Sequence, residues 1–384
     1  MNLDLTEEQI QIRNTVRELC GKEFAPRAAQ WDRDGKVDDE ALARLAEIGF
    51  LGMVIPEEAG GLGYDSRTVS IVLEEIAKVS AALAIMIAVQ NSVGALPVWM
   101  FGTDAQRKRF MPRLVSKDLA AFSLSEPGAG SDAGALESTA IRDGDHYVLN
   151  GSKNWVTNGM RAGVILVFAR TGPKGSGNKG LSCFIVERGA KGLVPGKPED
   201  KMGLRGSDTV ALSLEDLRVP ADQRLGEEGD GFRIAMSMLD TGRIGVGAQA
   251  LGVMKAAFEE AIRYAQERHA FGGPIAKIQA VQFKLSEMER RIQASELLIR
   301  KAAWLKDTGQ PYSRAAAMAK LYASEAATWV THQAIQVHGG YGYVKDYPVE
   351  RYYRDARVME IYEGTSEIQR LVIARSLMRE GAAV

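Results

Sequence analysis

The chain has 384 residues, 46% of them hydrophobic, so it is long enough to form two or three domains with a large buried core. Its formal net charge of −1 excludes a general basic surface for nucleic acid or for an anionic membrane. Cys20 and Cys183 lie far apart and the four histidines show no metal-ligand spacing. We therefore expect no metal site, no disulfide and a reducing, cytoplasmic location.

Helical periodicity dominates the first 120 residues. Thr6 and Gln9 have the spacing of a capping box at the start of an amphipathic stretch. A second apolar face recurs through residues 39–48. The apolar run 81–89 breaks at Gln90 and is too short to cross a bilayer, so we expect no membrane insertion. Residues 1–120 are predicted to form an N-terminal helical domain.

Short strands and turns follow in residues 121–228, which predict a middle β-domain. The Asn150-Gly151 dipeptide is typical of a two-residue hairpin turn. The expected strands are 146–149, 164–170, 182–187 and 210–214.

The helical period returns in long segments from residue 229 to residue 384. Segments 231–266, 276–306 and 312–338 each carry one apolar face, so we predict a C-terminal helical bundle. An all-helical part, a small β part and a bundle give an α+β chain.

Residues 124–132 contain glycines that permit close approach of a ligand to the backbone. The Gly-x-Gly-x-x-Ala pattern from Gly128 is typical of a Rossmann turn, but no long crossover helix follows it, so we reject that interpretation. Ser125 and Ser131 offer hydroxyl groups, although an ordinary turn accounts for the segment equally well.

Three further segments each allow a binding and a structural interpretation. Trp155 and Thr157 alternate on one strand face, where they can stack on a flat ring or simply fill the core. Arg268 lies between two long helices and suits either a phosphate or the helix C-terminus. The turn that begins at Gln336 is rich in glycine, which suits a C-cap or a cofactor contact.

Glu363 lies between an aromatic residue and a glycine, just before a Thr-Ser pair that opens an apolar stretch. Such a loop can bring a carboxylate into an apolar pocket ahead of a helix. Desolvation there raises the pKa of a carboxyl group toward the range of a general base. Taken alone, the segment also fits a solvated acid beside an N-cap.

Together these segments resemble the acyl-CoA dehydrogenase flavoprotein family along nearly the whole chain. The motifs come in the order and spacing of that family. They are Leu124-Ser-Glu-Pro-Gly-Ala-Gly-Ser-Asp132, Trp155-Val-Thr157, Arg268-x-x-Phe-Gly272 with Gln279, Gln336-x-x-Gly-Gly-x-Gly342 continuing to Tyr352-Tyr-Arg-Asp355, and Ile361-Tyr-Glu-Gly-Thr-Ser366.

The resemblance implies an N-terminal helical domain, a middle β-domain and a four-helix bundle, assembled as a homotetramer that binds FAD between protomers. Phe122 stands where many relatives have tyrosine, which removes a hydroxyl near the flavin but does not touch catalysis. The cofactor contacts implied by the resemblance are Phe122, Leu124, Ser125, Gly130, Ser131, Trp155, Val156, Thr157, Arg268, Phe271, Gln279, Gln336, Val337, Gly339, Gly340, Thr365 and Glu367.

The same resemblance implies that Glu363 removes the α-proton of an acyl-CoA while the β-hydrogen passes as hydride to flavin N5. Some relatives carry the base near Asp240 instead and have glycine at the Glu363 position. This chain has Gly242 in the first place, which assigns the base to Glu363. The substrate contacts implied are Ser131, Asp240, Arg243, Tyr362 and Gly364.

The implied product is a trans-2-enoyl-CoA, and the implied electron acceptor is electron-transfer flavoprotein. Segments 85–92, 239–245 and 361–372 look closest to short-chain members, so short straight acyl chains are expected. The alternatives are a medium-chain or branched-chain dehydrogenase, an acyl-CoA oxidase, and a non-catalytic binding member of the same fold.

Overall fold

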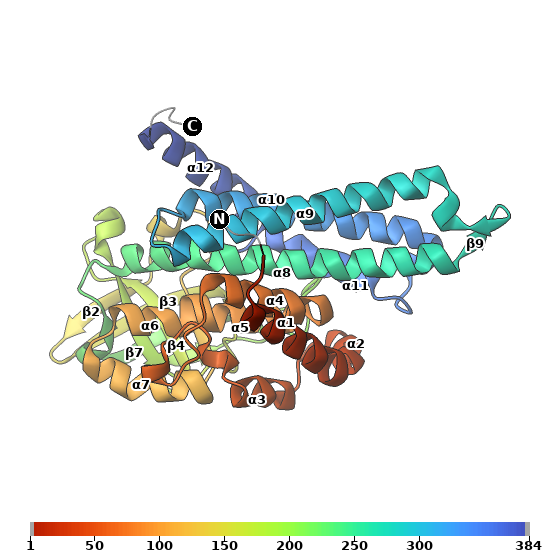
Figure 1. Ribbon diagram of the computed structural model, residues 1–384. Coiled ribbons are helices and arrows are strands. Elements are labelled where there is room, and N and C mark those ends of the chain that lie inside the picture. Colours follow the sequence, from red (N-terminus) through yellow and green to blue (C-terminus); the bar gives the residue numbers. More distant parts are fainter. Residues whose placement is uncertain (1–3, 381–384) are drawn as a thin grey trace.

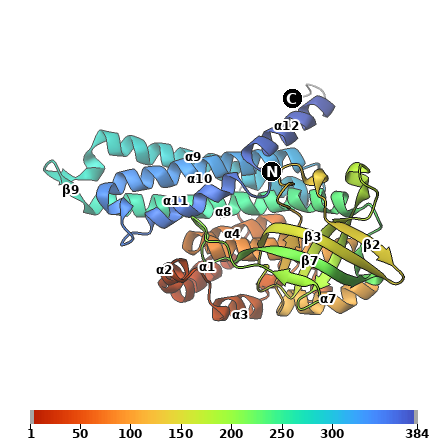
Figure 2. The same cartoon turned by 180° about the vertical axis from the view of Figure 1, so that it is seen from behind.

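The computed structural model describes residues 4–380, so the outer limits of the first and third predicted domains lie outside the described residues. A helical part, a sheet and a group of long helices follow one another along the chain (Figure 1). Helix α8 (Gly231–Glu267) runs the length of the molecule, with the N-terminal helices and sheet on one side and the other long helices on the opposite side (Figures 1 and 2). The predicted α+β fold is confirmed.

The N-terminal part begins with the predicted capping box. Thr6 Oγ1 accepts a hydrogen bond from the Gln9 amide at 3.2 Å, and Gln9 Oε1 accepts one from the Thr6 amide at 3.2 Å. The helices of this part are α1 (Glu7–Leu19), α2 (Ala25–Asp34), α3 (Asp39–Glu47), α4 (Ser66–Val79), α5 (Ala81–Val89), α6 (Ala95–Phe101) and α7 (Asp104–Ser116).

The apolar run ends at Gln90, but the helical backbone continues, because a π-helical turn, Gln90–Gly94, joins α5 to α6. Its polar side chains find backbone acceptors: Gln90 donates to the Leu114 carbonyl at 2.7 Å and Asn91 to the Phe50 carbonyl at 2.8 Å. The resulting helical run, Ala81–Phe101, has the length and apolar composition of a membrane span, but its most apolar window is entirely buried inside the protein. It is the central helix of the N-terminal core.

The middle part is a mixed sheet with the strand order β6-β7-β3-β2-β4-β5-β8, and β1 pairs in parallel with β4. A single 3₁₀ turn, Ala133–Ala135, separates the glycine-rich loop from the next strand, so the rejection of a Rossmann turn was correct. The strands are β1 (Ala120–Ser123), β2 (Thr139–Asp143), β3 (His146–Thr157), β4 (Val164–Arg170), β5 (Leu181–Glu187), β6 (Leu193–Pro195), β7 (Thr209–Pro220) and β8 (Arg224–Leu225).

The predicted hairpin turn at Asn150-Gly151 is wrong, because β3 continues through both residues. The register with β7 shifts between Leu149 and Gly151, which marks a bulge. Asn150 stabilises the bulge by donating to Asp216 Oδ1 at 3.0 Å and accepting from the Asp216 amide at 2.8 Å. Two side-chain hydrogen bonds therefore replace the turn that the dipeptide favours.

Helices α8, α9 (Gln279–Asp307) and α10 (Ser313–His338) lie side by side (Figure 1). Their bounds lie within a few residues of those of the three predicted long segments. Helices α11 (Val349–Arg357) and α12 (Ser366–Glu380) pack against α10. A short hairpin of β9 (His269–Ala270) and β10 (Gly273–Pro274) lies at the end of the bundle that is far from the sheet (Figure 1).

Two apolar clusters hold these parts together. The larger cluster runs from the N-terminal helices through the bundle and includes alternate residues of the sheet, such as Leu166 and Phe168. The smaller cluster lies within the β-domain and includes Ile165 and Val167 from the same strand. Strand β4 is therefore buried on both faces, which explains why its sequence is apolar throughout.

Asn158 joins the N-terminal helices to the sheet. It is fully buried, and its amide donates to the Met86 and Ala120 carbonyls, each at 3.1 Å. Replacing Asn158 by alanine leaves both carbonyls without this partner, so we expect the free energy of unfolding to fall by about 2–4 kcal/mol. Urea unfolding measures the change. The Asn14→Ala variant, at an exposed position on α1, is the control, and an equal loss in both would contradict the role of Asn158.

Candidate active site

Glu363 lies in the loop between a 3₁₀ turn, Val358–Glu360, and α12. The loop makes a sharp left-handed bend, with φ of 54° at Glu363 and 88° at Gly364. Thr365 then begins α12, because its Oγ1 accepts a hydrogen bond from the Ile368 amide at 3.3 Å. The helix expected to begin at the Thr-Ser pair therefore begins directly after the loop that carries the carboxylate.

The Glu363 carboxylate lies against the backbone of α8 at Gly242. A Cβ atom added to Gly242 would lie 2.2 Å from Glu363 Oε2, so only glycine leaves room for the acid. Glu363 Oε2 is buried and accepts no hydrogen bond from the described residues. The structure thus brings together the two positions at which the sequence placed alternative bases, and a carboxylate oxygen there is left unpaired.

Burial raises the pKa of Glu363 to about 7, and the positive charges of Arg243 and Lys320 act in the opposite direction. Arg243 is almost fully buried and forms an ion pair with Asp240. Burial raises the pKa of Asp240, while Arg243 lowers it. The base loop therefore meets an apolar environment that contains two cations and one further acid.

Tyr362, the residue before Glu363, points along α8. Its hydroxyl donates to Gln249 Oε1, and Gln249 donates through Nε2 to the Ala81 carbonyl at 2.7 Å. These contacts fix Tyr362 between the bundle and the N-terminal helices. They also orient the loop that carries Glu363.

The loop 124–131 is held against β3 by a buried ion pair. Lys153 Nζ lies 2.6 Å from Glu126 Oε1 and donates to the Leu124 carbonyl at 3.3 Å. The Asn154 amide donates to the Ser125 carbonyl at 2.9 Å. Gly130 and Ser131 remain exposed at the rim of the loop. Buried contacts thus fix a loop whose tip is free to meet a ligand.

Trp155 and Thr157 point away from the core of the β-domain, whereas Val156 lies within it. The Trp155 side chain is 64% exposed and its backbone has a φ of 62°. The core-filling interpretation is therefore wrong for Trp155, and Val156 can offer a ligand only its backbone. Phe122, on β1, packs its ring against Phe168 with centroids 4.8 Å apart.

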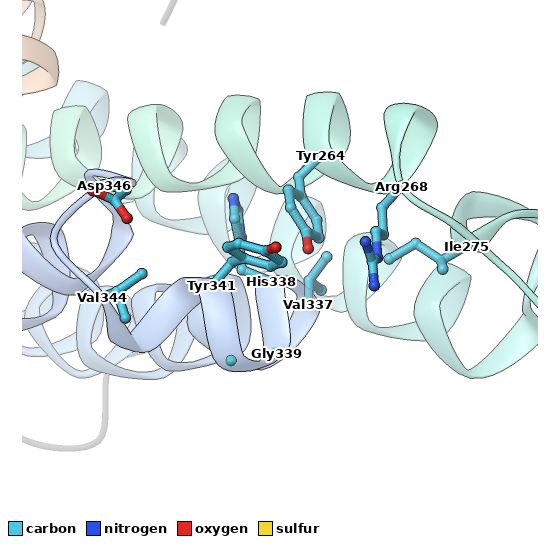
Figure 3. A pocket seen from close by; sticks show the side chains of 10 residues that line it. Tyr264, Arg268, Ile275, Val337, His338, Gly339, Tyr341, Val344 and Asp346 are labelled. Atoms are coloured by element: carbon cyan, nitrogen blue, oxygen red, sulfur yellow. The ribbon is translucent and has the colours of Figure 1, made fainter.

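A second site lies at the far end of the bundle. There α8 and the end of α10 enclose a pocket of about 600 Å³, in which Tyr264 and Arg268 face Tyr341 and Val337 (Figure 3). The other residues that line it are Ile275, His338, Gly339, Gly340, Val344 and Asp346. The structure thus brings together Arg268, Val337, Gly339 and Gly340, four of the residues that the resemblance assigns to the cofactor.

Other predicted cofactor contacts do not line this pocket. Phe271 is 98% exposed with a φ of 52°, and Gln279 begins α9 beside it. Gln336 is exposed on the last turn of α10. Glu367 is exposed on α12, far along the chain from this end. These side chains are free of the core of their own protomer.

Sequence reasoning missed the buried polar residues that support the site. Lys153 and Lys320 are both fully buried. Lys320 could have been found, because it lies at helical spacing from Ala316 and Ala323 on the apolar face of its segment. His338, which stacks on Tyr264 with ring centroids 4.3 Å apart, gave no comparable signal.

Comparison with known proteins agrees with this geometry. Family models match residues 6–118 as the acyl-CoA dehydrogenase N-terminal domain, 121–217 as the middle domain and 229–378 as the C-terminal domain. The mitochondrial short-chain specific acyl-CoA dehydrogenase of Bos taurus is 48% identical, over 98% of this chain and 92% of its own.

Solved structures give the same result. The butyryl-CoA dehydrogenase of Megasphaera elsdenii is 43% identical with a TM-score of 0.96, covering 99% of this chain and 100% of its own. A chain from a structure of the electron transferring flavoprotein of Acidaminococcus fermentans is 44% identical with a TM-score of 0.97, with coverage of 99% and 100%. The chain therefore belongs to the acyl-CoA dehydrogenase family.

Proposed function

We propose that this protein is an FAD-dependent dehydrogenase of short-chain acyl-CoA thioesters, with Glu363 as the base that removes the α-proton. The observation that carries the proposal is the unpaired Glu363 carboxylate lying against Gly242, with a pKa raised to about 7. The short-chain and butyryl-CoA dehydrogenases among the relatives support the substrate class. The product is a trans-2-enoyl-CoA.

The α-proton of a thioester is very weakly acidic, so its removal needs a poorly solvated base with a pKa near the working pH. Burial supplies that condition at Glu363, while Arg243 and Lys320 keep its charged form accessible. We assign the Glu363 backbone N–H to the thioester oxygen, where it stabilises the developing enolate. The same loop then supplies both the base and a hydrogen-bond donor.

The residues of the β-domain fit a flavin. Trp155 presents an exposed ring and Thr157 a hydroxyl from one strand face, and Ser125 lies on a loop fixed to that strand. Aromatic side chains stack on flat rings, and hydroxyl groups bond to their polar edges. FAD, when bound, supplies the acceptor for the β-hydrogen of the substrate.

The pocket at the far end of the bundle supports binding of the cofactor between two protomers. Gly242 lies on α8 and Arg268 directly follows the last residue of this helix, 26 residues further on, which corresponds to about 39 Å. One dinucleotide cannot contact both places in the same protomer. We therefore assign Arg268 and the Gly339-Gly340 turn to the cofactor of a neighbour, in a homotetramer.

Electron-transfer flavoprotein is the proposed electron acceptor. The similarity to a chain from the structure of the electron transferring flavoprotein of Acidaminococcus fermentans supports this assignment. A cytoplasmic location stays a prediction from the sequence.

The role of Glu363 as the base can be tested with the bound flavin as the reporter. Titration of the oxygen-free protein with butyryl-CoA should bleach the visible band of the bound flavin. Glu363→Gln should keep the flavin and bleach roughly 10³-fold more slowly, because it lacks the general base. The exposed Glu58→Gln variant, far along the chain, should behave as wild type. A flavin-loaded wild type that neither butyryl-CoA nor octanoyl-CoA bleaches would contradict the function but not the family.

The position of the Glu363 carboxylate against α8 can be tested at Gly242. In Gly242→Ala the new methyl group collides with the Glu363 carboxylate, so the base must move. A misplacement of about 1 Å can cost roughly 10²-fold in rate, and we expect kcat to fall by that order with the flavin retained. Gly245→Ala is the control, since its Cβ would approach Leu73 Cδ1 at 3.3 Å and Ala88 Cβ at 3.8 Å but not the Glu363 carboxylate. Equal kcat in Gly242→Ala and wild type would disprove the placement of the base.

The preference for short acyl chains can be tested with a series of substrates. Values of kcat/KM for straight-chain substrates from butyryl-CoA to dodecanoyl-CoA should peak at the short end. Each methylene that a pocket accepts or rejects changes the free energy of transition-state binding by about 1–3 kcal/mol, so the preference should be pronounced. A maximum at octanoyl-CoA or longer would replace the short-chain assignment by the medium-chain alternative.

A further inference from the structure

Lys320 on α10 is a buried lysine in an apolar setting. Its exposed fraction is 0%, and Ala316, Ala319 and Ala323 on the same helix are also fully buried. An ammonium group without water is costly unless it is well hydrogen-bonded, so an apolar residue would stabilise the bundle more simply. A lysine at this position therefore indicates a role beyond packing.

Lys320 binds the backbone of the base loop. Its Nζ donates to the Gly364 carbonyl at 2.7 Å. Gln369, a fully buried residue on α12, donates through Nε2 to the Glu363 carbonyl at 3.0 Å and to the Gly364 carbonyl at 2.9 Å. Two buried side chains from different helices thus hold two consecutive carbonyls.

These hydrogen bonds act where the backbone is strained. Glu363 has a φ of 54°, in the left-handed region that side chains with a Cβ disfavour. Such a conformation persists only when its surroundings enforce it. A Cβ on Gly364 would lie 2.7 Å from Gln369 Nε2, so the glycine lets the amide approach. The direction of the Glu363 side chain over Gly242 depends on this bend.

The same lysine is electrostatically coupled to the base. Burial lowers the pKa of Lys320 to about 8, and the positive charge of Arg243 also lowers it. The carboxylates of Glu363, Glu360 and Glu325 raise the pKa of Lys320 and so offset part of this effect. In return the ammonium group favours the charged form of Glu363, as Arg243 does from α8. Removing the ammonium group should therefore raise the pKa of Glu363.

We propose that Lys320 and Gln369 are positioning residues that clamp the Glu363–Gly364 backbone, and that Lys320 also places a positive charge near the Glu363 carboxylate. The role in catalysis rests on the proposed function, in which Glu363 is the base. The clamp itself concerns only the backbone of the loop, so it can be tested without turnover.

The clamp is tested by hydrogen–deuterium exchange of the holoenzyme. In Lys320→Met and in Gln369→Met, the amides of residues 361–369 should exchange at least about tenfold faster than in wild type, because the loop opens more often. Lys306→Met is the control: Lys306 is a partly buried lysine on α9, and its Nζ donates to Ser66 Oγ on α4 at 2.8 Å, away from the base loop. In Lys306→Met the amides of residues 361–369 should exchange as in wild type. Unchanged exchange in both clamp variants would overturn the clamp.

The charge is tested by the pH dependence of kcat/KM. In wild type the acid limb should lie near pH 7, the pKa of Glu363. Lys320→Met should raise this limb by about one unit and lower kcat more than it changes KM. Lys320→Arg keeps the charge and should leave the limb in place. An unmoved limb in Lys320→Met, or an equal shift in Lys320→Arg, would overturn the electrostatic role.

If Lys320→Met does not fold, Lys320→Gln replaces it, because glutamine keeps a hydrogen-bond donor and removes the charge. The pKa of the acid limb should then rise in Lys320→Gln but not in Lys320→Arg. If wild type does not oxidise any acyl-CoA, the proposed function fails, and loop exchange in Gln369→Met and Lys320→Gln still decides whether the clamp exists.

Discussion

The site depends on one constraint: a carboxylate must stay poorly solvated without losing its charged form altogether. Glu363 meets it by lying against the bare backbone of α8 at Gly242, with one oxygen unpaired. Isolated buried charges are too costly to persist, and cations within reach offset part of that cost. Arg243 and Lys320 supply this compensation from α8 and α10. The rigid bundle therefore sets the properties of a residue that itself lies in a loop.

The bundle also separates the two surfaces that we propose as cofactor contacts. Trp155 is exposed on β3, whereas Arg268 follows the last residue of α8 and lines the second pocket. Strand β3 and the β9 hairpin lie toward opposite ends of α8 (Figure 1). A long helix is stiff, so the distance between these surfaces is fixed. Phe271, in the hairpin that follows α8, is exposed and lies outside the apolar core. The length of α8 therefore supports the proposal that a neighbouring protomer completes the cofactor site.

Sequence patterns predicted the long helices and β4 because their apolar periodicity is also what buries them. Local patterns failed where distant side chains decide the backbone. Asn150-Gly151 forms a bulge because Asp216, on another strand, bonds to Asn150. Gln90 continues a helix because its amide reaches carbonyls from other helices. Glu363 could be named from its motif, but its setting against Gly242 and Lys320 depends on tertiary packing that no local pattern contains.

Backbone strain gives an independent indication of where the site lies. Within residues 4–380, the non-glycine residues with positive φ are Trp155, Asn158, Leu204, Asp216, Phe271 and Glu363. Three of them, Trp155, Phe271 and Glu363, are positions that the sequence motifs had already assigned to cofactor or substrate. Strained conformations tend to occur at functional sites, where surrounding contacts enforce them. Asn158 and Asp216 bond to neighbouring backbone or bulge residues, which explains them structurally. At Trp155 and Phe271 the local backbone enforces the left-handed conformation. Trp155 lies where the β3–β7 register shifts between Lys153 and Val156, and Phe271 with Gly272 forms the two-residue turn of the β9–β10 hairpin. Both side chains are exposed, so a bulge and a turn hold two of the proposed cofactor contacts away from the apolar core.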